Sequence, residues 1–187
     1  MICTNDVLGR DIENVLITEQ QINRRVREMA ATLMRDYEGK DLIMVGILNG
    51  AAVFYIDLLM EMDMPVEMNF MSVSSYGQST ESSGNVRIEY DIQANIEGKH
   101  VLIVEDIIDS GNTLKKLIPL LETRKPASVK TCVLLDKKER RTVDIDADYV
   151  CFEVPDVFIV GYGLDDAGKY RNLRYIGTLK PEIYQQN

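Results

Sequence analysis

The sequence predicts an α/β fold with a central, mostly parallel sheet flanked by helices. Two apolar runs, 41–48 and 101–104, have the composition of strands that are buried on both faces. Each run ends in a turn of small polar residues, and apolar residues at helical spacing follow at 53–59 and from Leu114. Strand, tight turn and helix in this order are the repeating unit of parallel α/β sheets.

Length and composition fit one globular domain. The chain has 187 residues and a formal net charge of −9, and we expect a single domain over 1–187. No long basic run occurs, so nucleic acid and anionic membranes are not expected as partners. No stretch resembles a signal peptide or a membrane span, which predicts a soluble cytoplasmic protein. Cys3, Cys132 and Cys151 lack metal-ligand spacing and are expected to be reduced thiols, the last two in the core.

The first half of the chain predicts one helix and a pair of strands. Thr18 and Gln21 have the spacing of a capping box, and apolar residues then recur at helical spacing to about Tyr37. The arginines between them predict a solvated helix face. Runs 66–73 and 86–90 predict strands, and the polar, Ser-rich stretch 74–85 between them is long enough to be disordered, functional or both.

The second half predicts two more strand regions, at 128–135 and within 149–166. Pro119 falls inside the helical pattern that begins at Leu114, which predicts a bend or an early end. The charged run 136–141 has the composition of a solvated loop. His100 is the only histidine and precedes the strand at 101–104, so we expect it at the opposite end from the acidic residues, without a catalytic role.

Three carboxylates crowd the end of the strand at 101–104, namely Glu105, Asp106 and Asp109. A helix-capping role would contribute only ~0.3–1 kcal/mol for each, whereas three neighbouring negative charges repel one another unless something positive binds. The small residues 110–113 then lead into a helix, where amide N–H groups and the helix dipole suit a phosphate. The pattern therefore predicts a ligand with a phosphate at one end and hydroxyls plus a magnesium ion further along.

Residues Val101 to Thr113 resemble the phosphoribosyl pyrophosphate signature of the type I phosphoribosyltransferases, and 105–111 most resembles the hypoxanthine-guanine enzymes. The resemblance comprises four motifs in the family's order, from about Leu42 to Gly177. It implies the type I phosphoribosyltransferase fold, with a core at about 20–165. It also implies a small hood subdomain over the base site, from N-terminal residues and about 150–187.

The resemblance implies a reaction as well. A phosphoribosyl group passes from 5-phosphoribosyl 1-pyrophosphate to hypoxanthine, and to guanine, giving IMP or GMP and pyrophosphate in purine salvage with Mg²⁺. Asp109 would be the general base at the purine imidazole ring. Lys137 would donate to the purine 6-oxo group, Phe158 would stack on the base, and the backbone of Ile159 would meet the base edge.

Further residues match the family's sugar, metal and pyrophosphate contacts. Glu105 and Asp106 would hold ribose hydroxyls directly or through the water shell of one magnesium, and Asp165 would bind a second magnesium beside pyrophosphate. The turn 48–50 would be the pyrophosphate loop, whose first peptide can be cis, and Arg171 would contact pyrophosphate. The expected substrate contacts are Leu48, Asn49, Gly50, Ser75, Tyr76, Glu105, Asp106, Ile107, Asp109, Ser110, Gly111, Asn112, Thr113, Lys137, Phe158, Ile159, Asp165 and Arg171.

Two of these positions carry a particular expectation. Asn49 stands where family members often carry Lys, so more of the pyrophosphate contact would come from backbone donors and the metal. Ser75 and Tyr76 match the Ser-Tyr pair of a mobile loop, here 74–85, that closes over the reaction centre and excludes water.

Other functions remain open from the sequence. A sibling transferase could prefer xanthine, which differs by one oxygen, whereas Lys137 together with 158–165 argues against a pyrimidine. A regulator could bind RNA or DNA on the same fold, but it should show a basic face or an added DNA-binding domain, and we expect neither in this acidic chain. The family resemblance also leads us to expect a homodimer or homotetramer.

Overall fold

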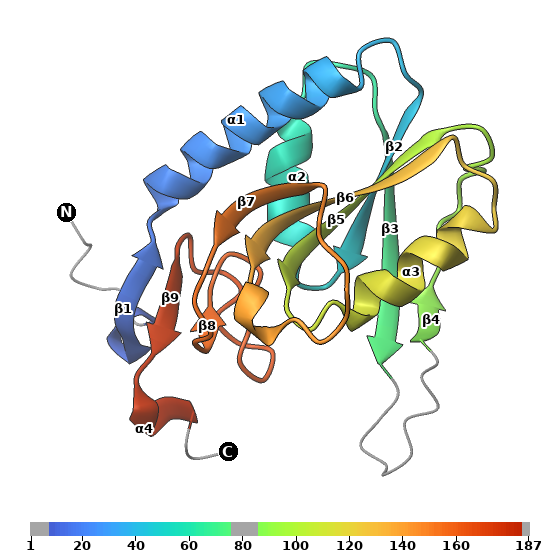
Figure 1. The fold of residues 1–187 in the computed structure, drawn as a ribbon. Helices are drawn as coiled ribbons and strands as arrows, with labels where there is room; N and C mark the ends of the chain where they lie inside the picture. The colour runs from blue at the N-terminus through green and yellow to red at the C-terminus, as the bar shows by residue number, and fades with distance from the viewer. Residues whose placement is uncertain (1–7, 76–85, 185–187) are drawn as a thin grey trace.

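A computed structural model describes residues 8–75 and 86–184 of the chain. The strands of its larger sheet are β2 (Leu42–Leu48), β3 (Glu67–Ser75), β4 (Val86–Tyr90), β5 (His100–Ile108), β6 (Ser128–Asp136) and β7 (Tyr149–Glu153). Their order is β4-β3-β2-β5-β6-β7 (Figure 1). All neighbours run parallel except β3 and β4. The predicted α/β class with a mostly parallel sheet is confirmed.

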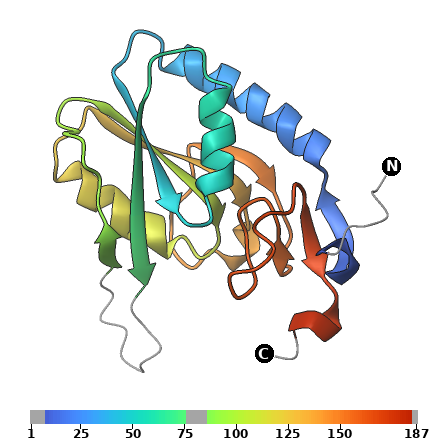
Figure 2. The same cartoon turned by 180° about the vertical axis from the view of Figure 1, so that it is seen from behind.

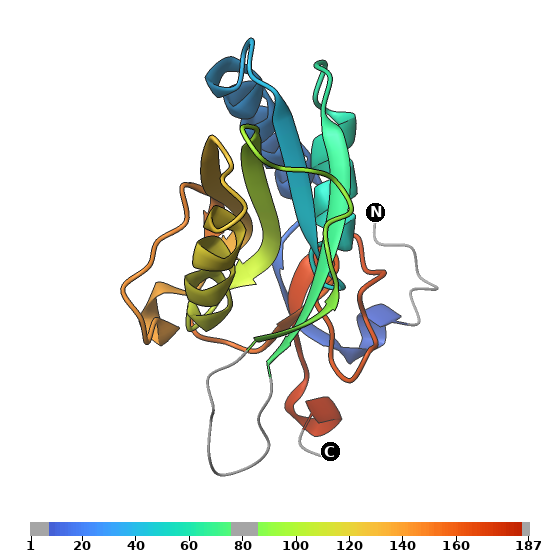
Figure 3. The same ribbon diagram turned by 90° about the vertical axis from the view of Figure 1, so that its right-hand side faces the viewer.

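Three helices cover the two faces of this sheet: α1 (Glu19–Asp36), α2 (Ala52–Met60) and α3 (Asn112–Glu122). Leu102 and Val104 of β5 pack in one core with residues of α1 and α2, the face seen in Figure 2. Val101 and Ile103 pack in a second core with α3, which lies on the other side of the sheet (Figure 3). Because both faces are covered, the strand is a continuous apolar run rather than an alternating one.

A second, three-stranded sheet joins the two ends of the described chain. It contains β1 (Ile12–Ile17), β9 (Ile176–Leu179) and β8 (Ile159–Val160), in the order β1-β9-β8 with antiparallel pairing. A third, smaller core lies here, formed by Ile12, Val160, Tyr170, Leu173 and Leu179. The sequence places its small subdomain in this region, but the division of the chain into domains stays a prediction.

Short helices complete the described structure. They are the 3₁₀ helices η1 (Leu8–Asp11) and η2 (Lys138–Arg140) and the terminal helix α4 (Pro181–Tyr184). No helix in the described ranges is long and apolar enough to cross a membrane.

Helix α1 begins and ends where the sequence predicts. The Thr18 side chain accepts a hydrogen bond from Gln21 N at 3.3 Å, and Thr18 N donates to Gln21 Oε1 at 2.8 Å, which completes the capping box. The C-cap is Tyr37. The predicted solvated arginine face is wrong for Arg25, which donates to the carbonyls of Val150 at 2.8 Å and Cys151 at 2.9 Å. This side chain therefore fastens α1 to β7.

Helix α3 does not end early at Pro119 but continues to Glu122, so that part of the prediction is wrong. A proline leaves one carbonyl in the preceding turn without its helical donor. The apolar stripe Leu114, Leu117 and Leu121 is at most 1% exposed, and its burial offsets that loss.

Other placements agree with the sequence. Cys132 and Cys151 are buried free thiols, whereas Cys3 lies outside the described residues. His100 begins β5, far from the strand's acidic end, and its Nδ1 lies 2.8 Å from Ser128 Oγ.

The hydroxyl of Tyr55 links β2 to β3 inside the α1–α2 core. It donates to Met44 O at 3.1 Å and accepts from Asn69 N at 3.2 Å, and burial raises its pKa to about 12. An unfolded tyrosine ionises near pH ~10. The neutral Tyr55 hydroxyl therefore makes its full contribution to the stability of the fold below pH ~10. This contribution is lost as the pH rises from there toward the folded pKa.

We expect Tyr55→Phe to flatten the alkaline loss of stability. The wild-type free energy of unfolding should fall by up to about 1.4 kcal/mol per pH unit more steeply than that of the variant above pH ~10. Urea unfolding at several pH values measures this. Tyr90→Phe is the control, because Tyr90 is 48% exposed. Identical slopes for wild type and Tyr55→Phe would contradict the assignment.

Candidate functional site

Strand β5 carries Glu105 and Asp106 to its carboxyl end, the edge where parallel sheets bind ligands. Glu105 is only 7% exposed, and burial together with the charge of Asp106 raises its pKa to about 8. Burial also raises the pKa of Asp106, although Ile107 N donates to its Oδ1 at 2.9 Å and Arg171 opposes the shift. Both carboxyls therefore resist ionisation in the free protein. A cation bound beside them would favour their ionised forms and be attracted by them.

The loop 109–113 follows directly and, with the end of β5, lines a cavity of about 270 Å³. Gly111 has φ +84° and precedes α3, which has no side-chain cap. Within the described residues, the amides of Ser110, Gly111 and Thr113 have no acceptor, and only Asn112 N is engaged, by Ser110 Oγ at 3.4 Å. Three N–H donors at the positive end of a helix are thus available to an anion.

Asp109 and Lys137 bring opposite charges to the same end of the sheet. Asp109 Oδ1 lies 3.3 Å from Arg140 Nε, yet among the described residues it accepts no hydrogen bond. Lys137 is 6% exposed and donates from Nζ to Val157 O at 2.7 Å. Burial lowers the pKa of Lys137, and the charge of Asp109 opposes that shift. The unsatisfied carboxylate oxygen is free to accept a proton or hydrogen bond from a ligand.

Phe158 is predicted to stack on the base, and the backbone of Ile159 is predicted to meet the base edge. Phe158 is 48% exposed, whereas Ile159 is 5% exposed and belongs to β8. They follow Val157, whose carbonyl holds the lysine. A half-exposed aromatic residue that follows the carbonyl holding a buried ammonium group is suited to a planar, carbonyl-bearing ligand.

The turn after β2 closes against the acidic pair. The peptide between Leu48 and Asn49 is cis, the form that the resemblance allowed. A Cβ at Gly50 would lie 1.7 Å from Asp106 Oδ2, and a Cβ at Gly163 would lie 2.1 Å from Gly50 O. Glycine is therefore required at both positions, and the turn packs between the end of β5 and the segment after β8.

Asp165 and Arg171 lie in that segment and pair with one another. Arg171 Nη2 is 2.7 Å from Asp165 Oδ1, and Arg171 Nη1 donates to Gly163 O at 2.5 Å. After burial, which is the main cause of the raised pKa of Asp106, Arg171 lowers that pKa and Asp165 raises it, so the charges of this pair act on Asp106 in opposite directions.

The described part of the chain contains no group of three or more His, Cys, Asp or Glu side chains placed to hold a metal ion. Magnesium commonly binds one or two carboxylates and takes its other ligands from water and substrate phosphates. The buried, oxygen-only pair of Glu105 and Asp106 fits that mode of binding.

The predicted closing loop stays untested. Ser75 is the last residue of β3, and Tyr76 with the rest of 76–85 lies outside the described residues.

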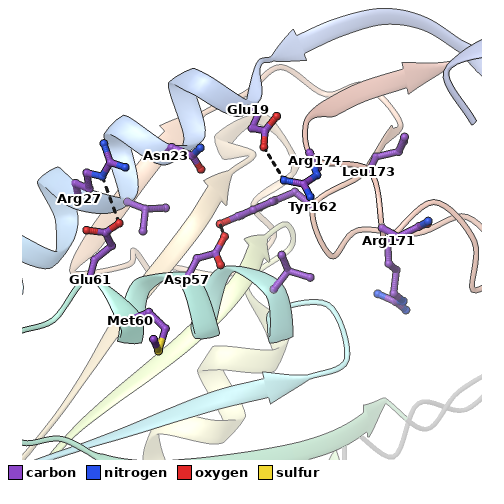
Figure 4. A pocket seen from close by; sticks show the side chains of 13 residues that line it. Glu19, Asn23, Arg27, Asp57, Met60, Glu61, Tyr162, Arg171, Leu173 and Arg174 are labelled. Atoms are coloured by element: carbon purple, nitrogen blue, oxygen red, sulfur yellow. Dashed lines mark hydrogen bonds and ion pairs between the residues drawn. The ribbon is translucent and has the colours of Figure 1, made fainter. Parts of the chain in front are cut away.

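A larger cavity of about 460 Å³ lies between α1, α2 and 162–174 (Figure 4). Its charges already have partners: Arg27 pairs with Glu61 at 3.3 Å, Arg174 pairs with Glu19 at 3.1 Å, and Tyr162 donates to Asp57 at 2.6 Å. Chemistry rather than size therefore marks the smaller cavity at β5 as the candidate site.

The charged run after β6 is not the solvated loop that its composition predicts. Asp136 is 1% exposed, the Arg141 side chain is 13% exposed, and the two pair at 2.5 Å, while Lys138 and Arg140 stay exposed. Asp136 follows an apolar run within its strand, as Glu105 does, which could have indicated a buried carboxylate. Nothing in the sequence distinguishes Arg141 from its neighbours.

Comparisons with known proteins agree with this geometry. The family model "Phosphoribosyl transferase domain" matches residues 15–167. The hypoxanthine-guanine phosphoribosyltransferase of Bacillus subtilis is 51% identical over 179 residues, covering 96% of this chain and 99% of that protein. A crystal structure of a hypoxanthine phosphoribosyltransferase from Staphylococcus aureus aligns with a TM-score of 0.93 at 50% identity, over 97% of this chain and 98% of the other.

These matches place the protein in a class: the chain belongs to the phosphoribosyltransferase family. Within it, the hypoxanthine-guanine phosphoribosyltransferases of Bacillus subtilis and Streptococcus pneumoniae are 51% and 49% identical and are each covered over 99% of their length, and the chain belongs to that group. The bifunctional TilS/HprT protein of Listeria monocytogenes is 52% identical over 182 residues, but this chain spans only 28% of its length.

We expect Gly50→Ala to weaken magnesium pyrophosphate binding, because the added methyl group displaces Asp106. Shifts of this size near a binding centre cost roughly tenfold or more, which calorimetry can measure. Gly39→Ala is the control, since nothing lies within 4 Å of a Cβ there, although its φ of +70° makes that variant less stable. Equal binding by wild type and Gly50→Ala would contradict the contact.

Proposed function

We propose that the protein transfers the phosphoribosyl group of 5-phosphoribosyl 1-pyrophosphate to hypoxanthine, and to guanine, releasing pyrophosphate and IMP or GMP. The observation that carries the proposal is the arrangement at the end of β5, where a buried carboxyl pair directly precedes a loop with three unengaged amides. The near-complete coverage of curated hypoxanthine-guanine phosphoribosyltransferases supports the same activity.

In this proposal the loop 109–113 holds the 5′-phosphate. The amides of Ser110, Gly111 and Thr113 donate to its oxygens, and the N-terminus of α3 favours its negative charge. Glu105 and Asp106 hold the ribose hydroxyls, which orients the anomeric carbon toward the base. These short-range contacts act despite the net charge of −9, because salt screens distant charges.

Glu105, Asp106 and Asp165 are the residues that would hold magnesium. When bound, the ion would neutralise the developing charge on the pyrophosphate leaving group. The backbone of the turn 48–50 supplies further donors where Asn49 lacks a charge. Arg171 has five N–H donors, so it can keep its bond to Gly163 O and still reach pyrophosphate.

The base binds against Phe158, with its 6-oxo group on Lys137. A lysine ammonium has three N–H donors, so Nζ can retain the carbonyl of Val157 and donate to the base as well. A cationic donor hydrogen-bonds to an oxo group, which accepts, and rejects an exocyclic amine. Asp109 takes the proton from the imidazole ring while the ring nitrogen bonds to the anomeric carbon and pyrophosphate leaves with its bonding electrons.

We also propose that the chain forms a homodimer or homotetramer. Helix α2 leaves Val53, Ile56 and Met60 37%, 39% and 80% exposed, an apolar stripe that a second copy could cover. One structural relative, the hypoxanthine phosphoribosyl transferase of Trypanosoma cruzi, was solved to study how its C-terminal region affects its oligomeric state and enzymatic activity.

In a panel of radiolabelled bases, we expect the wild type to transfer the phosphoribosyl group to hypoxanthine and guanine. We expect Lys137→Ala to lose 6-oxopurine binding selectively. Lys138→Ala is the matched control, because Lys138 is exposed and pairs with Glu153. Equal losses for hypoxanthine and adenine would reject the role of Lys137. Transfer to xanthine alone, or to no base, would reject the proposed substrate.

We expect Asp109→Asn to lose turnover by roughly 10²–10⁴-fold, the usual contribution of a general base, while IMP still binds. Steady-state rates and IMP titration separate the two effects. Asp156→Asn serves as control because Asp156 also lies near Arg140, at 3.7 Å, but has no proposed contact with the base. Near-normal turnover of Asp109→Asn would refute the assignment.

A further inference from the structure

Arg141 lies at the junction of β6 and the phosphate loop, although it belongs to no strand or helix. Its Nη2 pairs with Asp136 Oδ1 at 2.5 Å, and the two side chains are 13% and 1% exposed. Breaking a buried pair by removing one partner leaves the other charge uncompensated. The ion pair with Asp136 holds the guanidinium of Arg141 in one orientation at the end of β6.

The other arm of the same guanidinium reaches the loop. Arg141 Nη1 donates to the backbone carbonyl of Asp109 at 2.9 Å. The next residue continues the contact, because Thr142 N and Thr142 Oγ1 both donate to Ser110 O, at 3.1 and 3.3 Å. Two successive carbonyls of the loop are therefore held by 141–142.

The loop is also packed against this segment. A Cβ at Gly111 would lie 2.6 Å from Ile145 and 2.9 Å from Val143. Asn112 Nδ2 lies 3.4 Å from Thr142 Oγ1. The segment 141–145 therefore forms a wall behind the loop.

Peptide geometry converts these carbonyl contacts into amide directions. In a trans peptide, the C=O of one residue and the N–H of the next point in opposite directions. Holding the Asp109 and Ser110 carbonyls on the Arg141 side aims the N–H groups of Ser110 and Gly111 away from it. Those are two of the three amides without an acceptor among the described residues.

We propose that Arg141, oriented by Asp136, is a positioning residue that aims the loop amides at the 5′-phosphate without touching the substrate. This inference rests on the proposed function, since it assigns a support to that same phosphate site. The guanidinium shape is essential, because a single ammonium cannot serve Asp136 and the Asp109 carbonyl with the same forked geometry.

Arg141→Lys tests this while keeping the charge. Calorimetry gives the affinities of each variant for IMP and for inosine, which lacks the 5′-phosphate. We expect the IMP-to-inosine affinity ratio to fall roughly 10- to 100-fold, as for other displaced binding groups, with the KM for phosphoribosyl pyrophosphate rising more than kcat falls. A general loss of packing would weaken both ligands together.

Arg124→Lys is the matched control, because Arg124 makes a similar forked pair with Asp91, at 2.9 and 2.7 Å, at the opposite end of α3. It should keep the ratio, because Arg124 does not contact the loop 109–113. If Arg141→Lys does not fold, Thr142→Val replaces it, with an expected fall of about threefold for one lost neutral hydrogen bond.

A ratio within twofold of wild type, in Arg141→Lys or in its replacement, overturns the inference while IMP binding by the wild type leaves the proposed function intact. A wild-type protein that binds IMP no more tightly than inosine overturns the proposed function itself, and with it the inference.

Discussion

The crowding of carboxylates at the end of β5 is the constraint on which the rest of the site depends. Glu105 is held where burial and Asp106 oppose its ionisation, so the free protein carries an electrostatic cost at this position. Folding tolerates the cost because the strand run that leads to the site is fully buried, with Val101 to Val104 all 0% exposed. The core therefore supports a site that is poised for a cation and its ligand.

The central sheet could be predicted from continuous apolar runs in the sequence, because a strand covered on both faces has no room for polar residues. The capping box of Thr18 and Gln21 could be predicted as well, because it depends on two residues only three positions apart. The persistence of α3 through Pro119 was not predictable from local rules, because burial of Leu114, Leu117 and Leu121 decides it. Tertiary packing outweighs a single unfavourable residue.

The candidate site likewise has one part that could be predicted from the sequence and another that only the fold reveals. Residues 105–113 are contiguous, so their pattern could be recognised in the chain. The hydrogen bond of Arg141 to the Asp109 carbonyl, and those of Arg25 to the carbonyls of β7, link positions whose proximity only the fold creates. Charged side chains are usually solvated, and composition alone does not reveal which arginine finds a buried partner.

The pairing of β1 with β9 has a consequence for synthesis on the ribosome. Ile12 lies opposite Leu179, so the smaller sheet joins nearly the first and last described residues. Strands β2, β5 and β6 all precede β9 in the chain, and domains generally begin to fold from the N-terminal side as they emerge. The nascent protein can assemble its main layer early, but β1 must wait, unpaired, until β9 has been synthesised.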